Sequence, residues 1–233
     1  MVTDDGVSYE NAAPIEFDTA DFSGRLEADV LVLSLKRHAA DQVEARALVD
    51  PFIRAWEIDA GLTIGRPEFT LRFDSAQVVD RAPTPGIHEL QANATAIATA
   101  TLQLKVFRGH YPVPLLAFRT TPEVEALWAR YLRYLAGSEP LLSMAYACLT
   151  LLERGNRRQA AGLFGVEYEV LSKLGDLTST RGDALTARKP GQATAPLSST
   201  EAQWVDAAIR AVIRHLATRA GDKRLKMADL PAL

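Results

Sequence analysis

The most constraining feature of this sequence is a run of apolar residues at every second position between Leu90 and Val106. Polar residues such as Asn93, Thr95 and Gln103 fill many of the intervening positions. Because successive side chains of a strand point to opposite faces, this period of two predicts a sheet with one packed and one solvated face. At about 3.3 Å per residue the run would reach roughly 55 Å, so we expect a bulge, a bend or a hairpin break within it. The apolar set is Leu90, Ala92, Ala94, Ala96, Ala98, Ala100, Leu102, Leu104 and Val106.

Two shorter segments of the first half also have the character of strands. Ala28–Lys36 is aliphatic and β-branched, with a length that suits a buried strand, and Glu68–Asp74 alternates apolar and polar residues. Between them, Asp41–Asp50 carries apolar residues at helical spacing. Pro51 would interrupt a continuous helix, so we expect a second helix to begin there, capped by the preceding aspartate, and to stop at Gly61.

The second half changes to a period of three to four residues, which is typical of helices. Thr121, followed by a proline, is a helix start in front of the apolar stripe of Val124–Leu135. Leu141–Leu152 is apolar nearly all round, which predicts a central, buried helix. A further helix is expected within Phe164–Leu177, and Ser198–Glu201 is a capping box that opens the last helix.

Together these periodicities predict an α+β protein, with a mainly antiparallel N-terminal sheet covered by one or two helices and a C-terminal helical bundle. The expected boundaries are a flexible N-terminus over residues 1–14, a β-rich domain over 15–118, a helical bundle over 119–220 and a flexible tail over 221–233.

Composition agrees with a soluble globular protein, since 48% of the residues are hydrophobic and 24% are charged. No apolar run approaches the roughly 18 residues that a membrane span needs, and no secretory start is present, so we expect a cytoplasmic protein without membrane contact. Residues 1–120 carry 11 Lys and Arg against 17 Asp and Glu, whereas residues 121–233 carry 15 against 12. The second half is therefore mildly basic, short of the strong positive charge typical of nucleic-acid-binding domains.

The sequence contains no nucleophile elbow, no phosphate-binding P-loop and no dinucleotide fingerprint. The four histidines are far apart, and none has a partner at the spacing typical of metal ligands. The single cysteine, Cys148, falls on the apolar Leu141–Leu152 segment and is expected to be a small, inert hydrophobe. We therefore expect no metal, no cofactor and no identifiable catalytic residue.

One segment, Thr178–Lys189, is a candidate ligand site. It combines hydroxyls, a glycine and three cations between two predicted helices, a chemistry that suits a phosphate or a carboxylate. The alternative is that Arg181 and Asp183 pair with neighbours and tie the segment to the bundle. The candidates for anion binding are Thr178, Ser179, Arg181, Asp183, Thr186, Arg188 and Lys189.

Five further arginines form a candidate basic face, for which the alternative is an ordinary solvated helix surface. These are Arg154, Arg157, Arg158, Arg210 and Arg214.

The order of features from Trp128 to Ala220 resembles the HEPN-type helical domains of prokaryotic defence and toxin systems. In that family a buried helix precedes a helix ending in an Arg-x4–6-His motif, followed by a loop and a closing amphipathic helix. Arg181 matches the arginine of the motif, whereas Thr186 stands where the histidine should be. The family's ribonucleases use both residues on a dimeric RNA cleft. Because threonine cannot act as a general base near neutral pH, the resemblance implies a non-catalytic, dimeric relative.

We therefore favour the hypothesis of a non-catalytic binding protein of prokaryotic type, whose helical domain forms a homodimer and contacts RNA or another anionic ligand. One alternative is a metal-independent ribonuclease that uses Arg181 with a histidine from elsewhere, such as His215. The other is a structural accessory protein without a small-molecule site.

Overall fold

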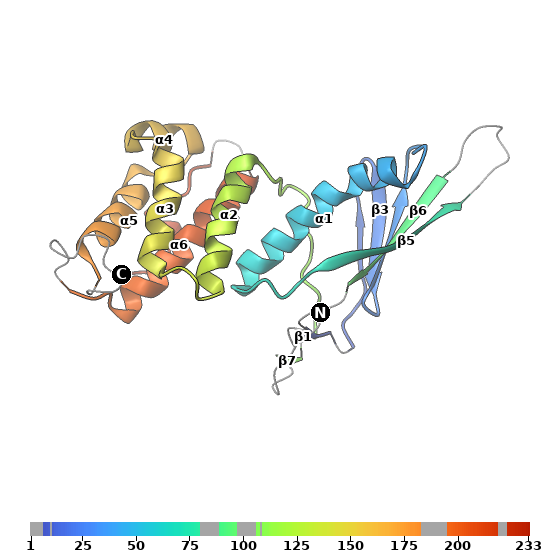
Figure 1. The fold of residues 1–233 in the computed structure, drawn as a ribbon, viewed down its shortest axis with the longest axis horizontal. Coiled ribbons are helices and arrows are strands. Elements are labelled where there is room, and N and C mark those ends of the chain that lie inside the picture. Colours follow the sequence, from blue (N-terminus) through green and yellow to red (C-terminus); the bar gives the residue numbers. More distant parts are fainter. Residues whose placement is uncertain are drawn as a thin grey trace. The chain divides into compact units, whose positions relative to one another are not determined.

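The computed structural model describes residues 7–9, 11–79, 89–96, 106–107, 109–182, 195–218 and 223–233. The chain divides into two compact units, Met1–Leu116 and Ala117–Leu233. The first unit holds the strands and one long helix, and the second holds the remaining helices (Figure 1). The predicted α+β class is confirmed.

A five-stranded antiparallel sheet forms the base of the first unit, with the strand order β2-β3-β4-β6-β5. Sequence reasoning missed β2 and β3, whose alternation is short and, in β3, interrupted by Gly24. A separate parallel pair joins β1 (Val7–Ser8) to β7 (Val106–Phe107). The strands of the large sheet are β2 (Ile15–Asp18), β3 (Phe22–Glu27), β4 (Val30–Leu35), β5 (Leu71–Val79) and β6 (Glu89–Ala96).

Strand β4 is packed on one face only. Leu31, Leu33 and Leu35 are buried, whereas Val30, the first residue of the strand, is 40% exposed. The aliphatic Ala28–Lys36 run therefore forms an alternating strand of an antiparallel sheet, in agreement with the predicted sheet that has one packed face.

Helix α1 (Gln42–Ile64) is one continuous helix, so the predicted break at Pro51 is wrong. Pro51 lies inside the helix with its ring exposed, where its lost hydrogen bond faces solvent. Gly61 is buried within the helix instead of ending it, and the helix ends at Gly65, which has a φ of 78°. Burial of the face that carries Trp56 therefore outweighs the local cost of the proline.

The core of the first unit lies between α1 and one face of the sheet (Figure 1). Trp56 is at its centre and donates its indole N–H to the carbonyl oxygen of Pro112 at 2.8 Å. Phe17 packs on Phe52 and Trp56, with ring centroids 5.1 and 5.5 Å apart. The predicted covering layer is therefore a single helix.

The alternating run Leu90–Val106 contributes residues to two of the described strands. Its first part forms β6, which pairs with β4 and β5, and its last residue, Val106, begins β7. The expected interruption falls within residues 97–105, which lie outside the described part of the chain.

The second unit contains α2 (Pro122–Leu135), α3 (Leu141–Glu153), α4 (Arg157–Phe164), α5 (Tyr168–Thr180) and α6 (Ser199–Thr218). The predicted helices over α2 and α3 are confirmed, including the Thr121 cap and the buried α3 residues. The predicted helix over Phe164–Leu177 is wrong at its start. Phe164 ends α4, and Gly165, with a φ of 65°, separates it from α5.

Both ends of the chain contain packed residues where free tails were expected. Tyr9 is buried and its ring lies 4.8 Å from that of Tyr111. Leu225 is buried and forms a parallel bridge with Val166, and the short helix η1 (Met227–Asp229) follows it. The packing of Tyr9 and Leu225 is a feature that the sequence reasoning missed. Among the described helices, none is long and apolar enough to cross a membrane.

Candidate functional site

The first residues of the candidate Thr178–Lys189 segment belong to the last turn of α5. Thr178 is 1% exposed, and its hydroxyl donates to the carbonyl oxygen of Gly175 at 3.1 Å. Ser179 is partly buried in the same turn. The hydroxyl of Thr178 is thus used within the helix.

Arg181 joins the end of α5 to the start of α6. Its Nε donates to a carboxylate oxygen of Glu201 at 3.0 Å, and its side chain is about one-third exposed. Glu201 also completes the predicted capping box: it accepts from the backbone N–H of Ser198 at 2.9 Å, and its own N–H donates to the Ser198 hydroxyl at 3.1 Å. We name Arg181, Glu201 and Ser198 the α5–α6 clasp.

The clasp favours the ionised form of Glu201. The hydrogen bond from the Ser198 backbone, followed by that from Arg181, holds the pKa of this carboxyl below its ordinary value of 4.5. The carboxylate is therefore charged at neutral pH and is a weak proton acceptor there.

The backbone at Arg181 and Gly182 is hydrogen-bonded to the backbone at Ala195. Arg181 makes a parallel bridge with Ala195, and the N–H of Gly182 donates to the Ala195 carbonyl oxygen at 3.0 Å. The two chain positions that flank residues 183–194 are thereby held side by side. The remaining candidates, Asp183, Thr186, Arg188 and Lys189, lie outside the described residues.

Three of the five arginines predicted to form a basic face are paired with carboxylates. Arg157 donates to Glu153, Arg210 donates to Asp206 at 2.9 Å, and the guanidinium of Arg154 lies 3.6 Å from Glu123.

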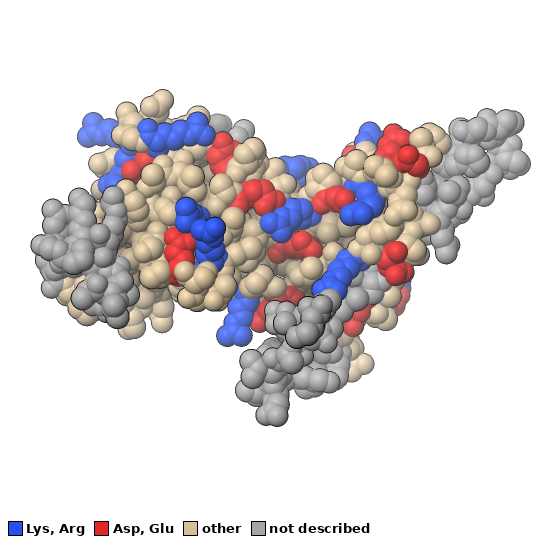
Figure 2. Space-filling model, in the orientation of Figure 1, with Lys and Arg blue, Asp and Glu red and all other residues tan. Residues whose placement is uncertain are grey.

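The other two predicted arginines differ in setting. The guanidinium of Arg158 lies 5.7 Å from the ring centroid of Tyr168, and Arg214 is exposed on α6. Figure 2 shows cationic atoms gathered over α4 and mixed charges elsewhere on this face of the helical unit. Arg154, Arg157 and Arg158 follow one another closely around the start of α4, and the first two are paired with carboxylates.

The described histidines and the cysteine show no catalytic arrangement. His38 and His110 are exposed, and His215 lies near the end of α6. Cys148 is 1% exposed, and burial raises the pKa of its thiol to about 12, so it is an inert core residue as predicted. Within the described ranges, no group of three His, Cys, Asp or Glu is placed to hold a metal ion.

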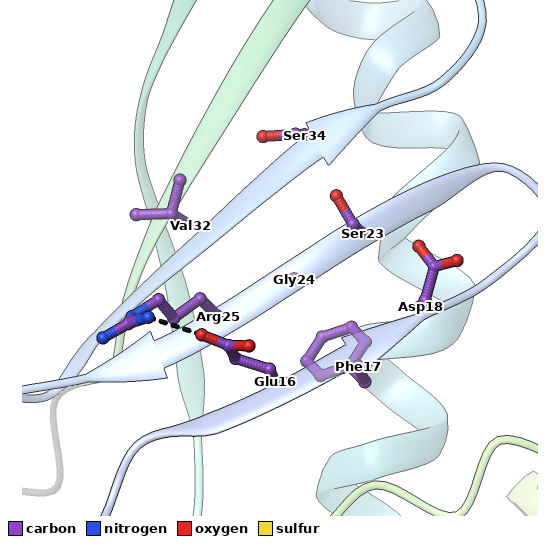
Figure 3. A pocket seen from close by; sticks show the side chains of 8 residues that line it. All are labelled: Glu16, Phe17, Asp18, Ser23, Gly24, Arg25, Val32 and Ser34. Atoms are coloured by element: carbon purple, nitrogen blue, oxygen red, sulfur yellow. Dashed lines mark hydrogen bonds and ion pairs between the residues drawn. The ribbon is translucent and has the colours of Figure 1, made fainter.

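The sheet offers a second surface that sequence reasoning missed. A hollow of about 700 Å³ lies on β2, β3 and β4 (Figure 3). The hydroxyls of Ser23 and Ser34 and the side chain of Val32 line it, and Arg25 pairs with Glu16 at its rim. The signal for this surface was the alternation Ser23, Arg25, Glu27 along β3, which is too short to identify without its neighbouring strands.

The eight residues that line the hollow combine two carboxylates, one arginine and two hydroxyls with a small apolar patch. They include no histidine, cysteine or lysine, and Arg25 and Glu16 neutralise each other. This arrangement can hold a partner through hydroxyl groups and a small apolar patch.

Comparisons with protein-family models, with curated proteins and with solved structures each gave no match to this chain.

Proposed function

We propose that this chain is a non-catalytic binding protein with an HEPN-like helical unit, which pairs with a second copy and contacts RNA or another anionic ligand. The α5–α6 clasp carries this proposal. In the HEPN-type motif the arginine works with a histidine, whereas Arg181 is bonded to Glu201 at 3.0 Å and joins two helices. An arginine committed to a carboxylate has a structural task and little free charge to offer a scissile phosphate.

The alternative pairing of Arg181 with His215 is disfavoured within one chain. Arg181 contacts Glu201 at the start of α6, and His215 lies 14 positions further along the same helix. At a rise of 1.5 Å per residue these positions are separated by about 21 Å along the axis. Two groups that share one proton transfer must lie within hydrogen-bond reach, so this pair does not form an intramolecular catalytic site.

The anionic ligand is inferred from the sequence, which places two adjacent cations in the candidate segment. Arg188 and Lys189 follow the fixed base formed by Arg181, Gly182 and Ala195. Because most of the predicted basic face is internally paired, we expect few phosphate contacts and a shallow dependence of binding on salt.

Binding and cleavage are tested together with a labelled single-stranded RNA. The native full-length chain should raise the fluorescence anisotropy of the RNA and leave it intact, and Arg188→Ala with Lys189→Ala should weaken binding by about tenfold. The matched control, Arg66→Ala with Arg72→Ala, removes the same charge from the sheet unit and should bind as the native chain does.

Two results would overturn the proposal. Cleavage that is lost in a folded Arg181→Lys variant would establish a ribonuclease. Equal binding by the native chain and the Arg188→Ala, Lys189→Ala variant, or no binding by either, would remove the anionic site and favour a structural accessory protein.

Pairing with a second copy is what the HEPN-type resemblance implies. Leu163 on α4 is 71% exposed, so a charged residue placed there tests this pairing without disturbing the core. Light scattering of the native chain should give the mass of a dimer, and Leu163→Lys should give that of a monomer. Val43→Lys, at a 76% exposed position of α1, is the control and should leave the dimer intact. A native monomer, or a Leu163→Lys dimer, would contradict the assigned interface.

A further inference from the structure

The corner between α4 and α5 is occupied by a segment from the end of the chain. Leu225 donates its backbone N–H to the Gly165 carbonyl oxygen at 3.0 Å and accepts from the N–H of Glu167 at 2.9 Å. The N–H of Met227 donates to a Glu167 carboxylate oxygen at 3.1 Å. Three contacts from the main chain of one short segment therefore hold it to the corner.

These contacts use groups that the two helices leave unsatisfied. Gly165 is the C-cap of α4 and Glu167 is the N-cap of α5, and helix ends expose carbonyl oxygens and N–H groups that lack partners within the helix. A strand-like peptide satisfies such groups through its backbone, whatever its side chains are. The corner therefore offers backbone and carboxylate groups that can hydrogen-bond to an extended peptide.

One leucine side chain supplies the specificity. Leu225 is 8% exposed, whereas Lys223, Arg224 and Lys226 around it are exposed. The corner itself presents the acidic residues Glu167 and Glu169 in the first turn of α5. The occupant is therefore a buried leucine between cations, laid against an acidic helix start.

The shape of the corner depends on Gly165. Its φ is 65°, and a Cβ built there would lie 3.2 Å from Nε2 of His215. The site is at the end of α6, remote from the α5–α6 clasp at the start of that helix.

We propose that this corner is a docking site for a linear peptide with a leucine between basic residues, that Lys223–Met227 occupies it in cis, and that a matching segment of a partner protein displaces it. The contact is small, one buried side chain and three hydrogen bonds, so the occupied form is exchangeable. A tethered segment has an effective concentration of about millimolar, so the native chain resists a free peptide below that level.

The test uses the full-length chain and a fluorescein-labelled peptide with the sequence of Lys223–Asp229. Leu225→Asp should open the corner by placing a charge where the leucine was buried. This variant should bind the peptide at least tenfold more tightly than the native chain, and a peptide with aspartate in place of the leucine should not bind. Leu233→Asp, at a 49% exposed position of the same tail, should behave as the native chain does.

Hydrogen exchange gives a second measurement. The Glu167 amide, protected by Leu225 in the native chain, should exchange faster in Leu225→Asp and regain protection when the peptide is added.

Three outcomes would overturn the proposal. A folded Leu225→Asp chain that fails to bind the peptide removes the docking site. Loss of the helical fold in both Leu225→Asp and the milder Leu225→Ala makes the segment an inseparable part of the bundle. A native dimer that becomes a monomer in Leu225→Asp, with Leu163→Lys still dimeric, places the segment on a second copy in place of the cis arrangement.

Discussion

Phe17 and Gly24 face each other directly in the β2–β3 pair. A Cβ built on Gly24 would lie 2.2 Å from the Phe17 ring, and that ring is held from behind by Phe52 and Trp56. The glycine is therefore required by the close approach of an aromatic side chain that has no room to move.

Gly24→Ala should lower the free energy of unfolding of the sheet unit by about 2 kcal/mol, because an overfilled core forces its neighbours out of their preferred rotamers. Denaturant unfolding, monitored by tryptophan fluorescence, measures this free energy of unfolding. Gly109→Ala is the matched control, since a Cβ there meets nothing within 4 Å. Equal stability of the two variants would show that Phe17 does not pack on Gly24 in solution.

Arg181 illustrates which properties of a candidate site residue can be predicted from the sequence. The sequence placed it in the Thr178–Lys189 segment and offered both a ligand role and a pairing role. In the described structure it contacts Glu201, which lies 20 positions away along the chain. Spacing along the chain cannot predict this contact, because two helix ends meet only when the bundle is packed.

At the scale of elements, α1 conflicts most with its sequence. Pro51 predicts a break, yet the helix runs through it to Gly65. The apolar residues on both sides of the proline, such as Val49 and Trp56, are buried against the same sheet. Local propensity is a weak force compared with the burial of a continuous helical face.

Pro51→Ala should raise the stability of the sheet unit by about 1–3 kcal/mol, since the exposed ring is lost without loss of packing and a backbone donor is restored. Thermal unfolding measured by circular dichroism checks this. Pro122→Ala, at the first position of α2, should give no gain, because proline is favourable there. A Pro51→Ala chain of unchanged or lower stability would mean that the packing of α1 needs a bend at this point.

The α5–α6 clasp makes a second prediction at this scale. Because the pKa of Glu201 is lower in the folded chain than its ordinary value of 4.5, the unfolded chain binds more protons as the pH falls towards that range. The stability given by this carboxylate is complete above the unfolded-state pKa and is lost as the pH falls through the folded-state pKa.

Glu201→Gln should therefore be less stable than the native chain at neutral pH and should approach it in acid, at about pH 3. Ser198→Ala, which removes the hydroxyl cap, should cost about 1 kcal/mol at every pH. Urea unfolding at a series of pH values measures both variants. If the difference in free energy of unfolding between Glu201→Gln and the native chain stayed constant with pH, an ionic contribution of the clasp would be excluded.

At the scale of the whole molecule, the two units have separate cores that the sequence already distinguishes by its two periodicities. Cys148 reports on the core of the helical unit. It is 1% exposed, and burial raises the pKa of its thiol to about 12.

In the native chain, a thiol reagent at neutral pH should modify Cys148 slower than in the denatured chain by a factor on the order of 10³ or more, since a marginally stable domain opens only rarely. The absorbance of the leaving group that the reagent releases measures the rate of modification. Comparable rates in the two states would contradict the burial of α3.

The sequence by itself determined the α+β class, the two halves, the strands β4 to β6 in outline, the helices α2 and α3, and the capping box at Ser198. These features depend on side-chain period and on local backbone chemistry, which act over a few residues. Only the tertiary structure decided the passage of α1 through Pro51, the pairing of Arg181 with Glu201 and the seat of Leu225 at the α4–α5 corner. Each of these features brings together residues through tertiary packing. The free energy of that packing exceeds local conformational preferences, and it cannot be predicted from the spacing of residues along the chain.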